Sequence, residues 1–363
     1  MIACLDLFPP VIHTEYMVDT AFALGLGERY LEVADVHNDK KAFGGKSLAF
    51  NEIPFNLYAS ASEEVFKKAG ELLRALISDS GIKKQDVNIV IPDSQSYTRI
   101  FEMPMLTDKE LLSAIKYQAD QFIPIPIDKV SLDVHILHKD KVNKKVDILL
   151  VAAPNTVIEN VVQLAESASL LPVSIENEAS ATLRLLSALH EMKKPDPQDT
   201  TEYEVFINFG NSSSSIYLFD VKQQRALQMH NFNIGQSIFY RDIQSNYSLE
   251  EQKIKELIET VGFAEGESTY NLHQLLSSPL NELVSEIKRF LMSAKQEISQ
   301  KPKKLYLFGE GSKFAHLDEK LSSLLGETIA MVNLTEYFEK SSVTEYFAND
   351  WPLLVPVIGG AIR

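Results

Sequence analysis

A repeated order of elements is the strongest constraint on the fold of this chain. Three runs of strand-forming residues come first, then a helical segment of period 3.6 ending before Gly81, then a buried strand at 86–93. The same order returns in the second half, with three strand-like runs within 202–235, helical segments at 250–262 and 281–300, and a strand at 304–311. We therefore predict an α/β protein made of two copies of a βββαβα unit with a cleft between them.

Length and charge narrow the class of protein. At 363 residues the chain exceeds the usual size of one hydrophobic core, which favours two lobes. A formal charge of −15 argues against nucleic acid as a main partner and predicts repulsion from an anionic lipid surface. The single cysteine, Cys4, excludes an internal disulfide and a cysteine-built zinc site. Since no apolar run reaches the length of a membrane helix and the start lacks a basic region, we expect a cytoplasmic protein without direct membrane insertion.

A distinctive segment separates the two copies. Thr107 and Glu110 have the spacing of a capping box, and the helix that they open presents a stripe of apolar residues before it stops near Pro124. Two strands, at 130–137 and 145–154, follow this helix. A polar, proline-containing stretch at 193–202 is typical of a hinge.

Several blocks of sequence together carry a family resemblance. They are "MPMLTDKELLSAIKYQADQFIPIPIDKVSLDVHIL", "INFGNSSSSIYLFD", "LYLFGEGSKFAHL" and the terminal "GGAIR". From about Phe22 to Arg363 the chain resembles the actin-like ATPase superfamily and, within it, the PilM family of type IV pilus assembly proteins, related to the division protein FtsA. The resemblance implies an actin-like ATPase fold with an inserted subdomain of the 1C type. The segments expected from it are a leader (1–20), subdomain 1A (21–95 with 172–198 and 343–363), subdomain 1C (96–171) and subdomains 2A and 2B (199–342).

The superfamily binds ATP between its halves through three loops, and the resemblance assigns all three. In the first, Gly25 stands where the family has the metal-positioning aspartate, Gly27 keeps the family glycine, Glu28 replaces a serine, and Glu32 replaces a lysine. In the second, Asn208 and Ser215 replace both carboxylates, whereas Gly210 is kept. In the third, Gly309 and Gly311 remain, but the family proline and last glycine are missing.

These replacements predict that nucleotide hydrolysis has been lost. Magnesium needs hard oxygen ligands, usually supplied through a carboxylate, and the two family aspartates are absent. A carboxylate at Glu28, about 4 Å from a phosphate charge, costs roughly 1 kcal/mol in water and about 4 at an effective dielectric of 20. We expect a pseudo-ATPase with no catalytic residue, no metal site and no cofactor, with ATP binding at most weakened.

The run Ile123, Pro124, Ile125 and Pro126 forms the candidate partner site. Because proline removes ladder donors, this run does not fit a central strand and predicts a rigid apolar ridge. The alternative is a connector packed on its own subdomain, since X-Pro segments commonly end helices. In PilM proteins a groove beside the insert takes the N-terminal tail of the membrane protein PilN, with an I-N-L-L-P type motif and basic residues that suit an acidic host.

The resemblance therefore implies a scaffold of the type IV pilus, or of a related secretion machine, peripheral to the inner membrane through a PilN-like tail. Assembly motor proteins and a ring of several copies are the further partners that it implies. The leader segment "CLDLFPP" is loosely similar to the tail motif, so it is a candidate to compete for the same groove; a frayed or surface-packed terminus is the alternative. The alternative functions are an active actin-like ATPase or sugar kinase, which Asn208 and Ser215 oppose, and an FtsA-like filament former, which would need an amphipathic membrane helix.

Overall fold

The structure is a computed structural model, and it describes residues 21–39, 41–59, 62–193, 201–264, 270–296, 298, 300–302 and 304–363. The predicted leader lies outside these residues. The chain divides into two compact units. Unit 1 comprises 1–185, 338–344 and 356–363, and unit 2 comprises 186–337 and 345–355.

Unit 1 contains a five-stranded sheet of order β3-β2-β1-β4-β8. Its strands are β1 (Phe22–Leu26), β2 (Tyr30–Asp39), β3 (Ala42–Glu52), β4 (Asp86–Ile91) and β8 (Leu171–Asn177). The first three strands are joined as antiparallel hairpins, whereas β4 and β8 run parallel to β1. The carboxyl end of β4 leads into the short helix η1 (Asp93–Gln95).

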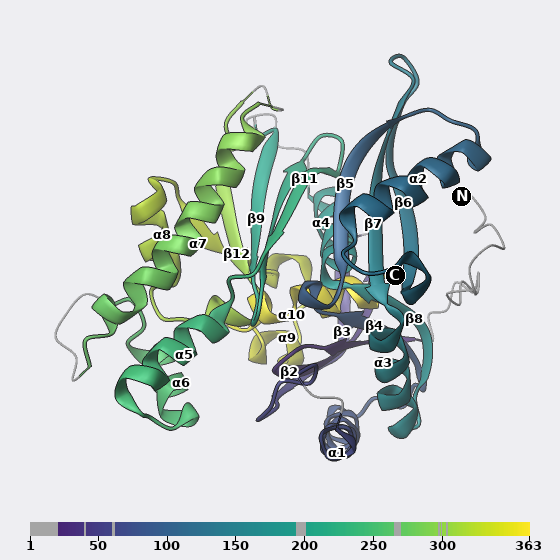
Figure 1. The fold of residues 1–363 in the computed structure, drawn as a ribbon. Helices are drawn as coiled ribbons and strands as arrows, with labels where there is room; N and C mark the ends of the chain where they lie inside the picture. The colour runs from purple at the N-terminus through teal and green to yellow at the C-terminus, as the bar shows by residue number, and fades with distance from the viewer. Residues whose placement is uncertain are drawn as a thin grey trace. The chain divides into compact units, whose positions relative to one another are not determined.

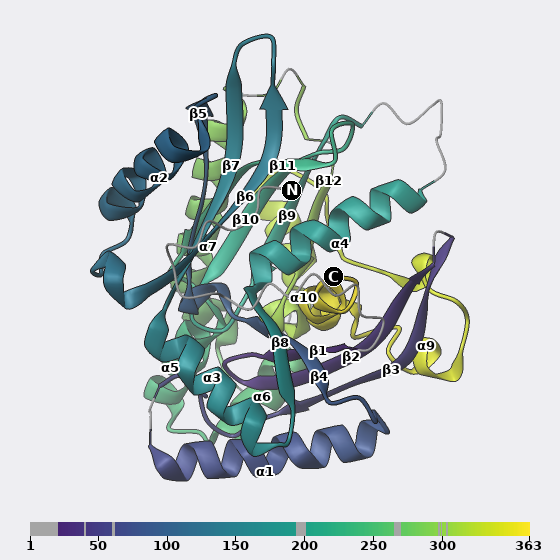
Figure 2. The ribbon, with the colours of Figure 1, turned by 90° about the vertical axis from the view of Figure 1, so that its right-hand side faces the viewer.

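Two helices cover one face of this sheet, and the first of them begins and ends at capping residues. In Figure 2, α1 (Glu63–Ser80) and α3 (Asn155–Ser167) lie below the sheet. Ser62 caps α1 by accepting a hydrogen bond from the Val65 N–H, and Gly81 ends it in the left-handed conformation at φ 73°. Alternate strand residues such as Leu24 and Ile89 meet Leu73 and Leu164 of these helices in one buried core. The predicted helix and its end at Gly81 are confirmed.

The insert of unit 1 forms a second, three-stranded sheet of order β5-β7-β6. It consists of β5 (Tyr97–Pro104), α2 (Asp108–Phe122), η2 (Ile127–Lys129), β6 (Val130–Asp140) and β7 (Lys145–Pro154). Figure 1 shows α2 lying across this sheet. The predicted capping box is present, with Thr107 and Glu110 joined through both of their side chains. Ile115 and Ala119 of α2 are buried against Ile148 and Leu150 of β7.

The predicted segment 96–171 also includes α3, whose buried residues Val161, Leu164 and Ala165 lie in the core of the five-stranded sheet. The subdomain boundaries themselves remain predictions from the family resemblance.

Unit 2 repeats the architecture of the first sheet. Its strand order is β11-β10-β9-β12-β13, again with an antiparallel triple on one side and two parallel strands on the other. The strands are β9 (Tyr203–Phe209), β10 (Ser214–Asp220), β11 (Arg225–Phe232), β12 (Lys304–Phe308) and β13 (Ile329–Met331). The predicted duplication of the α/β unit is confirmed by this matched order.

The helices of unit 2 are α5 (Gln236–Tyr247), α6 (Glu251–Thr260), α7 (Leu272–Ala294) and α8 (Leu317–Leu325), with the short helices η3 (Glu310–Lys313) and η4 (Thr335–Tyr337). In Figure 1, α7 runs along the sheet, and Leu283, Ile287, Phe290 and Ala294 of this helix are buried. The helix ends at Ala294, so Ile298 packs on the core from outside it. The remaining helices, α4 (Glu178–Met192), α9 (Ser342–Tyr346) and α10 (Trp351–Ala361), each contribute residues to both units.

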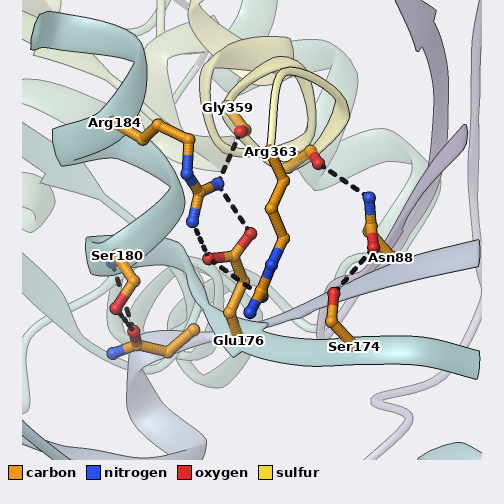
Figure 3. A network of polar contacts seen from close by, with 9 residues as sticks. Asn88, Ser174, Glu176, Ser180, Arg184, Gly359 and Arg363 are labelled. Atoms are coloured by element: carbon orange, nitrogen blue, oxygen red, sulfur yellow. Dashed lines mark hydrogen bonds and ion pairs between the residues drawn. The ribbon is translucent and has the colours of Figure 1, made fainter. Parts of the chain in front are cut away.

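The terminal "GGAIR" is fastened to the sheet of unit 1 by a polar network (Figure 3). The Arg184 guanidinium donates to both oxygens of Glu176 and, at 2.7 Å, to the carbonyl of Gly359. Asn88 donates to the carbonyl of Gly360, and Arg363 lies 3.8 Å from Glu176. Glu176 is nearly buried, so it serves as the anchor of this terminus. The sequence pattern did not predict helix α10, which includes the first three residues of this terminus.

Candidate functional site

The first candidate loop is the turn between β1 and β2 in unit 1. Gly25 lies opposite Glu32 in the antiparallel ladder. A Cβ atom on Gly25 would stand 2.7 Å from Oε2 of Glu32 and 3.1 Å from its Cβ. The Glu32 side chain, which is 7% exposed, therefore covers the position where the family carries its aspartate. A carboxylate is present here, but it comes from the neighbouring strand.

Glu28 of the same turn is held within unit 1. Its carboxylate Oε1 accepts hydrogen bonds from the Ser94 hydroxyl at 2.6 Å and from the Gln95 amide at 3.4 Å, and the residue is 3% exposed. The backbone of the turn is also tied down, because Leu57 donates to the Glu28 carbonyl and the Tyr58 hydroxyl donates to the Leu26 carbonyl. The Glu28 carboxylate is therefore buried and held in place by Ser94 and Gln95 of η1.

The second candidate loop joins β9 and β10 in unit 2. Asn208 and Ser215 face each other in the ladder, and the Asn231 amide donates to the Ser215 hydroxyl at 3.0 Å. The carbonyl of Gly210 accepts from the Gln236 N–H at 2.9 Å, and the Asn211 carbonyl accepts from the Ser237 N–H at 3.0 Å. Because these are the first N–H groups of α5, the loop itself satisfies the donors that often bind an anion at a helix start.

The third candidate loop, after β12, packs directly on the second. Gly309 has φ 96°, and a Cβ there would stand 2.1 Å from Oδ1 of Asn208. A Cβ on Gly311 would meet the Phe209 ring at 2.2 Å. Between them, Glu310 is 8% exposed and accepts from the Gln236 amide at 3.2 Å. Both glycines are thus required by the close approach of the two loops.

These loops depart from the superfamily pattern in the groups that they could offer to a magnesium nucleotide. Asn208 and Ser215 offer an amide and a hydroxyl where the family has carboxylates, and Gly25 offers no side chain. Within the described ranges, no group of three or more His, Cys, Asp or Glu side chains is arranged to hold a metal ion. The structure joins the second and third loops in unit 2 and places the first in unit 1.

The candidate partner ridge is split by its own alternation. It connects α2 to η2, and Ile123 is only 5% exposed, in the core of the three-stranded sheet. Ile125 is partly buried against the same core, whereas Pro124 and Pro126 are exposed. The burial of Ile123 favours the connector interpretation, whereas Pro124, Pro126 and the partly exposed Ile125 stay candidates for partner contact.

A pocket of about 170 Å³ was missed by sequence reasoning; it is called here the base pocket because it lies at the base of the insert, and the name does not refer to a nucleotide base. Its lining comes from the 57–58 turn, α1, the end of η1 and the first three turns of α3, all in unit 1. The residues are Leu57, Tyr58, Phe66, Gln95, Thr156, Val157, Asn160, Val161 and Leu164. Gln95 stands just before β5 and Thr156 just after β7, so the base pocket lies where the insert leaves and rejoins the rest of unit 1.

Comparisons with known proteins agree with this architecture. The family model described as type IV pilus assembly protein PilM matches residues 24–363. A solved structure, a PilM–PilN type IV pilus biogenesis complex, matches with a TM-score of 0.80 at 21% identity, covering 95% of this chain and 99% of that chain. Ethanolamine utilization protein EutJ from Carboxydothermus hydrogenoformans matches with a TM-score of 0.50 at 11% identity, over 94% of this chain and 89% of that one. The comparison with curated protein sequences gives no match.

The fold, with its duplicated sheets and its insert, is thus the actin-like ATPase fold. No helix within the described ranges is long and apolar enough to cross a bilayer. The family model spans almost the whole chain, from the first strand to the last residue. This chain belongs to the PilM family of type IV pilus assembly proteins.

Proposed function

We propose that this chain is a scaffold of the type IV pilus assembly platform that binds the N-terminal tail of a PilN-like membrane protein, and that it no longer hydrolyses ATP. The base pocket is the observation that carries the first part. It is formed by residues on both sides of the insert, and a structure similar to this chain was solved as a complex of PilM with PilN.

The lining of the base pocket suits an extended peptide. Leu57, Phe66 and Val157 supply apolar surface for aliphatic side chains. The amides of Gln95 and Asn160 and the hydroxyl of Thr156 can pair with the backbone groups of a peptide that has no secondary structure of its own. The acidic charge of the chain favours a tail with basic residues.

Loss of hydrolysis is supported by the chemistry of the loops. Glu32 covers Gly25, and Glu28 adds a second buried carboxylate beside the same turn. Two negative side chains near a phosphate site disfavour a nucleotide, and the second loop has no carboxylate to compensate them with a metal. A scaffold of this kind would be held at the cytoplasmic face of the inner membrane through its partner, where motor proteins and further copies of the chain could join it.

A pocket-filling variant tests the tail site. We expect Asn160→Tyr, which places a ring in the base pocket, to weaken binding of a synthetic peptide with the I-N-L-L-P motif and flanking lysines by about tenfold or more. Gln163→Tyr, on an exposed position of the same helix, is the matched control and should bind normally. A Pro124→Ser/Pro126→Ser variant asks separately whether the exposed prolines contribute. Equal affinity for Asn160→Tyr and Gln163→Tyr would place the tail elsewhere.

Phosphate release from Mg-ATP tests the second part. We expect the purified chain to show no turnover above a buffer blank, with or without the tail peptide. Steady turnover by the chain would contradict the proposal and favour the ATPase alternative.

A further inference from the structure

The turn at the end of the β6–β7 hairpin presents an unusual surface, called here the hairpin tip. It comprises residues 139–145 together with Met105 and Leu106. At its apex, Val142 is 91% exposed. Figure 2 shows this turn at the outer end of the three-stranded sheet, at the top of the view.

Val142 is displayed by an ordered turn. The Asp140 carboxylate accepts hydrogen bonds from the N–H groups of Val142 at 2.9 Å and Asn143 at 3.0 Å, and from the Asn143 side-chain amide at 2.7 Å. Lys144 then reverses the chain at φ 53°. These bonds fix the turn, so the apolar apex is a standing feature of the insert.

Two further apolar side chains lie next to this turn, in the segment that follows the neighbouring strand β5. The Met105 N–H donates to the Lys144 carbonyl at 2.8 Å, which fastens the segment after β5 to the turn. Met105 is 44% exposed and Leu106 is 37% exposed. Three exposed apolar side chains from two segments therefore lie at one end of the insert.

The charge of the hairpin tip is opposite to that of the chain. Residues 139–145 contain four lysines and one aspartate, whereas the whole chain has a formal charge of −15. Lys139, Lys141, Lys144 and Lys145 are all exposed. Lys145 pairs with Glu102 at 2.6 Å, whereas Lys141 and Lys144 flank Val142 and are exposed.

An aliphatic apex with lysines around it has the chemistry of a membrane-surface contact. Apolar side chains enter the boundary between headgroups and acyl chains, while lysines reach anionic headgroups with their ammonium groups. A protein partner would need a hollow shaped to this protruding apex, but a lipid surface deforms around it. We propose that the hairpin tip makes a direct, reversible contact with a bilayer surface rich in anionic lipids. The proposal rests on the proposed function only in placing the chain beside a membrane.

The acidic charge of the whole chain does not prevent such a contact. At physiological ionic strength the Debye length is about 8 Å, so carboxylates far from the apex are largely screened from the lipid surface. The charges near the headgroups are then the four lysines of the hairpin tip, which outnumber the carboxylates beside them, Asp140, Asp147 and the Glu102 that pairs with Lys145. The repulsion expected from net charge alone is thus reversed locally.

Vesicle flotation of the full chain tests the proposal without any partner protein. We expect binding to vesicles of equimolar phosphatidylglycerol and phosphatidylcholine, weak or no binding to phosphatidylcholine alone, and loss of binding in high salt. Lys139→Glu/Lys141→Glu should lower the partition coefficient by about tenfold or more. Its matched control is Lys67→Glu/Lys83→Glu, which makes the same charge change at exposed positions elsewhere in unit 1.

The apolar part has its own comparison. Val142→Ser should weaken vesicle binding. Leu171→Ser, which changes an exposed aliphatic residue elsewhere in unit 1, should not. In a Cys4→Ser background, a fluorophore on Val142→Cys should shift to the blue when anionic vesicles are added. Equal binding of tip variants and controls, or no preference for anionic vesicles, would overturn the proposal. If the tip variants bound lipid normally but lost self-association or affinity for the tail peptide, the hairpin tip would be a protein interface instead. Measuring tail-peptide binding on the same variants keeps this proposal separate from the proposed function.

Discussion

Restoring the family aspartate at Gly25 should destabilise the first hairpin unless Glu32 is changed with it. A Cβ at position 25 would lie 2.7 Å from Oε2 of Glu32, closer than real Cβ contacts, so the Glu32 side chain must move. Overpacking of this kind costs about 1–3 kcal/mol. A new carboxylate about 4 Å from that of Glu32 adds about 4 kcal/mol at an effective dielectric of 20. We therefore expect Gly25→Asp to lower the stability of the sheet around β1 by about 5–7 kcal/mol.

Two companion variants separate the steric part from the electrostatic part. Gly25→Ala meets the same atoms without a charge, so it should lose about 1–2 kcal/mol, because alanine recovers part of the cost as a better strand residue than glycine. The double variant Gly25→Asp/Glu32→Lys places opposite charges across the ladder, as the family pattern does. It should recover at least about 2 kcal/mol beyond the sum of the two single variants.

Native-state hydrogen exchange of the β1 and β2 amides is the appropriate assay, since a chain of two units need not unfold in one step. The protection of these amides gives the local free energy of opening for each variant. If Gly25→Asp behaves like Gly25→Ala, or if Glu32→Lys gives no rescue beyond additivity, then Glu32 does not cover Gly25 in solution.

Three further predictions address the turn of the insert, the third loop and the C-terminus. The N–H and side-chain amide of Asn143 hold the pKa of Asp140 below its usual value. The contribution of Asp140 to the stability of the turn is therefore complete above the unfolded-state pKa and is lost as pH falls through the folded-state pKa. The amide chemical shifts of Val142 and Asn143 should follow that acid titration, and their failure to move would contradict the hydrogen bonds. Gly309→Ala should destabilise unit 2 by more than about 1–2 kcal/mol, because φ is 96° there and the new Cβ would lie 2.1 Å from Oδ1 of Asn208. Thermal unfolding measures this loss of stability, and an unchanged midpoint would contradict the packing of the two loops. Arg184→Met should loosen the terminal residues, because it removes the guanidinium that pairs with the Glu176 carboxylate and binds the Gly359 carbonyl. Limited proteolysis should then cut the C-terminus faster. The exposed control Arg74→Met should leave proteolysis of that terminus unchanged.

Much of the fold was accessible from local sequence chemistry. The repeated order of strands and helices along the chain follows from the periodicity of apolar residues, and the ends of α1 and the start of α2 follow from Ser62, Gly81 and the Thr107–Glu110 pair. These signals act over a few residues, so one sequence contains them in full. Helix α10 was not predicted, because its apolar residues are interrupted by Pro356 and two glycines, and its place is set by contacts with Ala181 and Val90.

The candidate site depends on register and on long-range contacts, which local patterns do not contain. The sequence identified Gly25 and Glu32 as replacements, but only the β1–β2 register brings the two together. The base pocket is lined by four separate segments, and no one of them has a distinctive motif. For Ile123 to Pro126, the sequence left the ridge and the connector as alternatives, and the burial of Ile123 favours the connector.

A calorimetric titration of the full chain with the tail peptide, in buffer and again with Mg-ATP, tests the central claim most directly. The account predicts saturable one-to-one binding with the same affinity in both buffers, because the base pocket lies in unit 1 and the loops do not supply ligands for a magnesium nucleotide. Absence of binding in buffer, or binding that requires Mg-ATP and is accompanied by phosphate release, would contradict it.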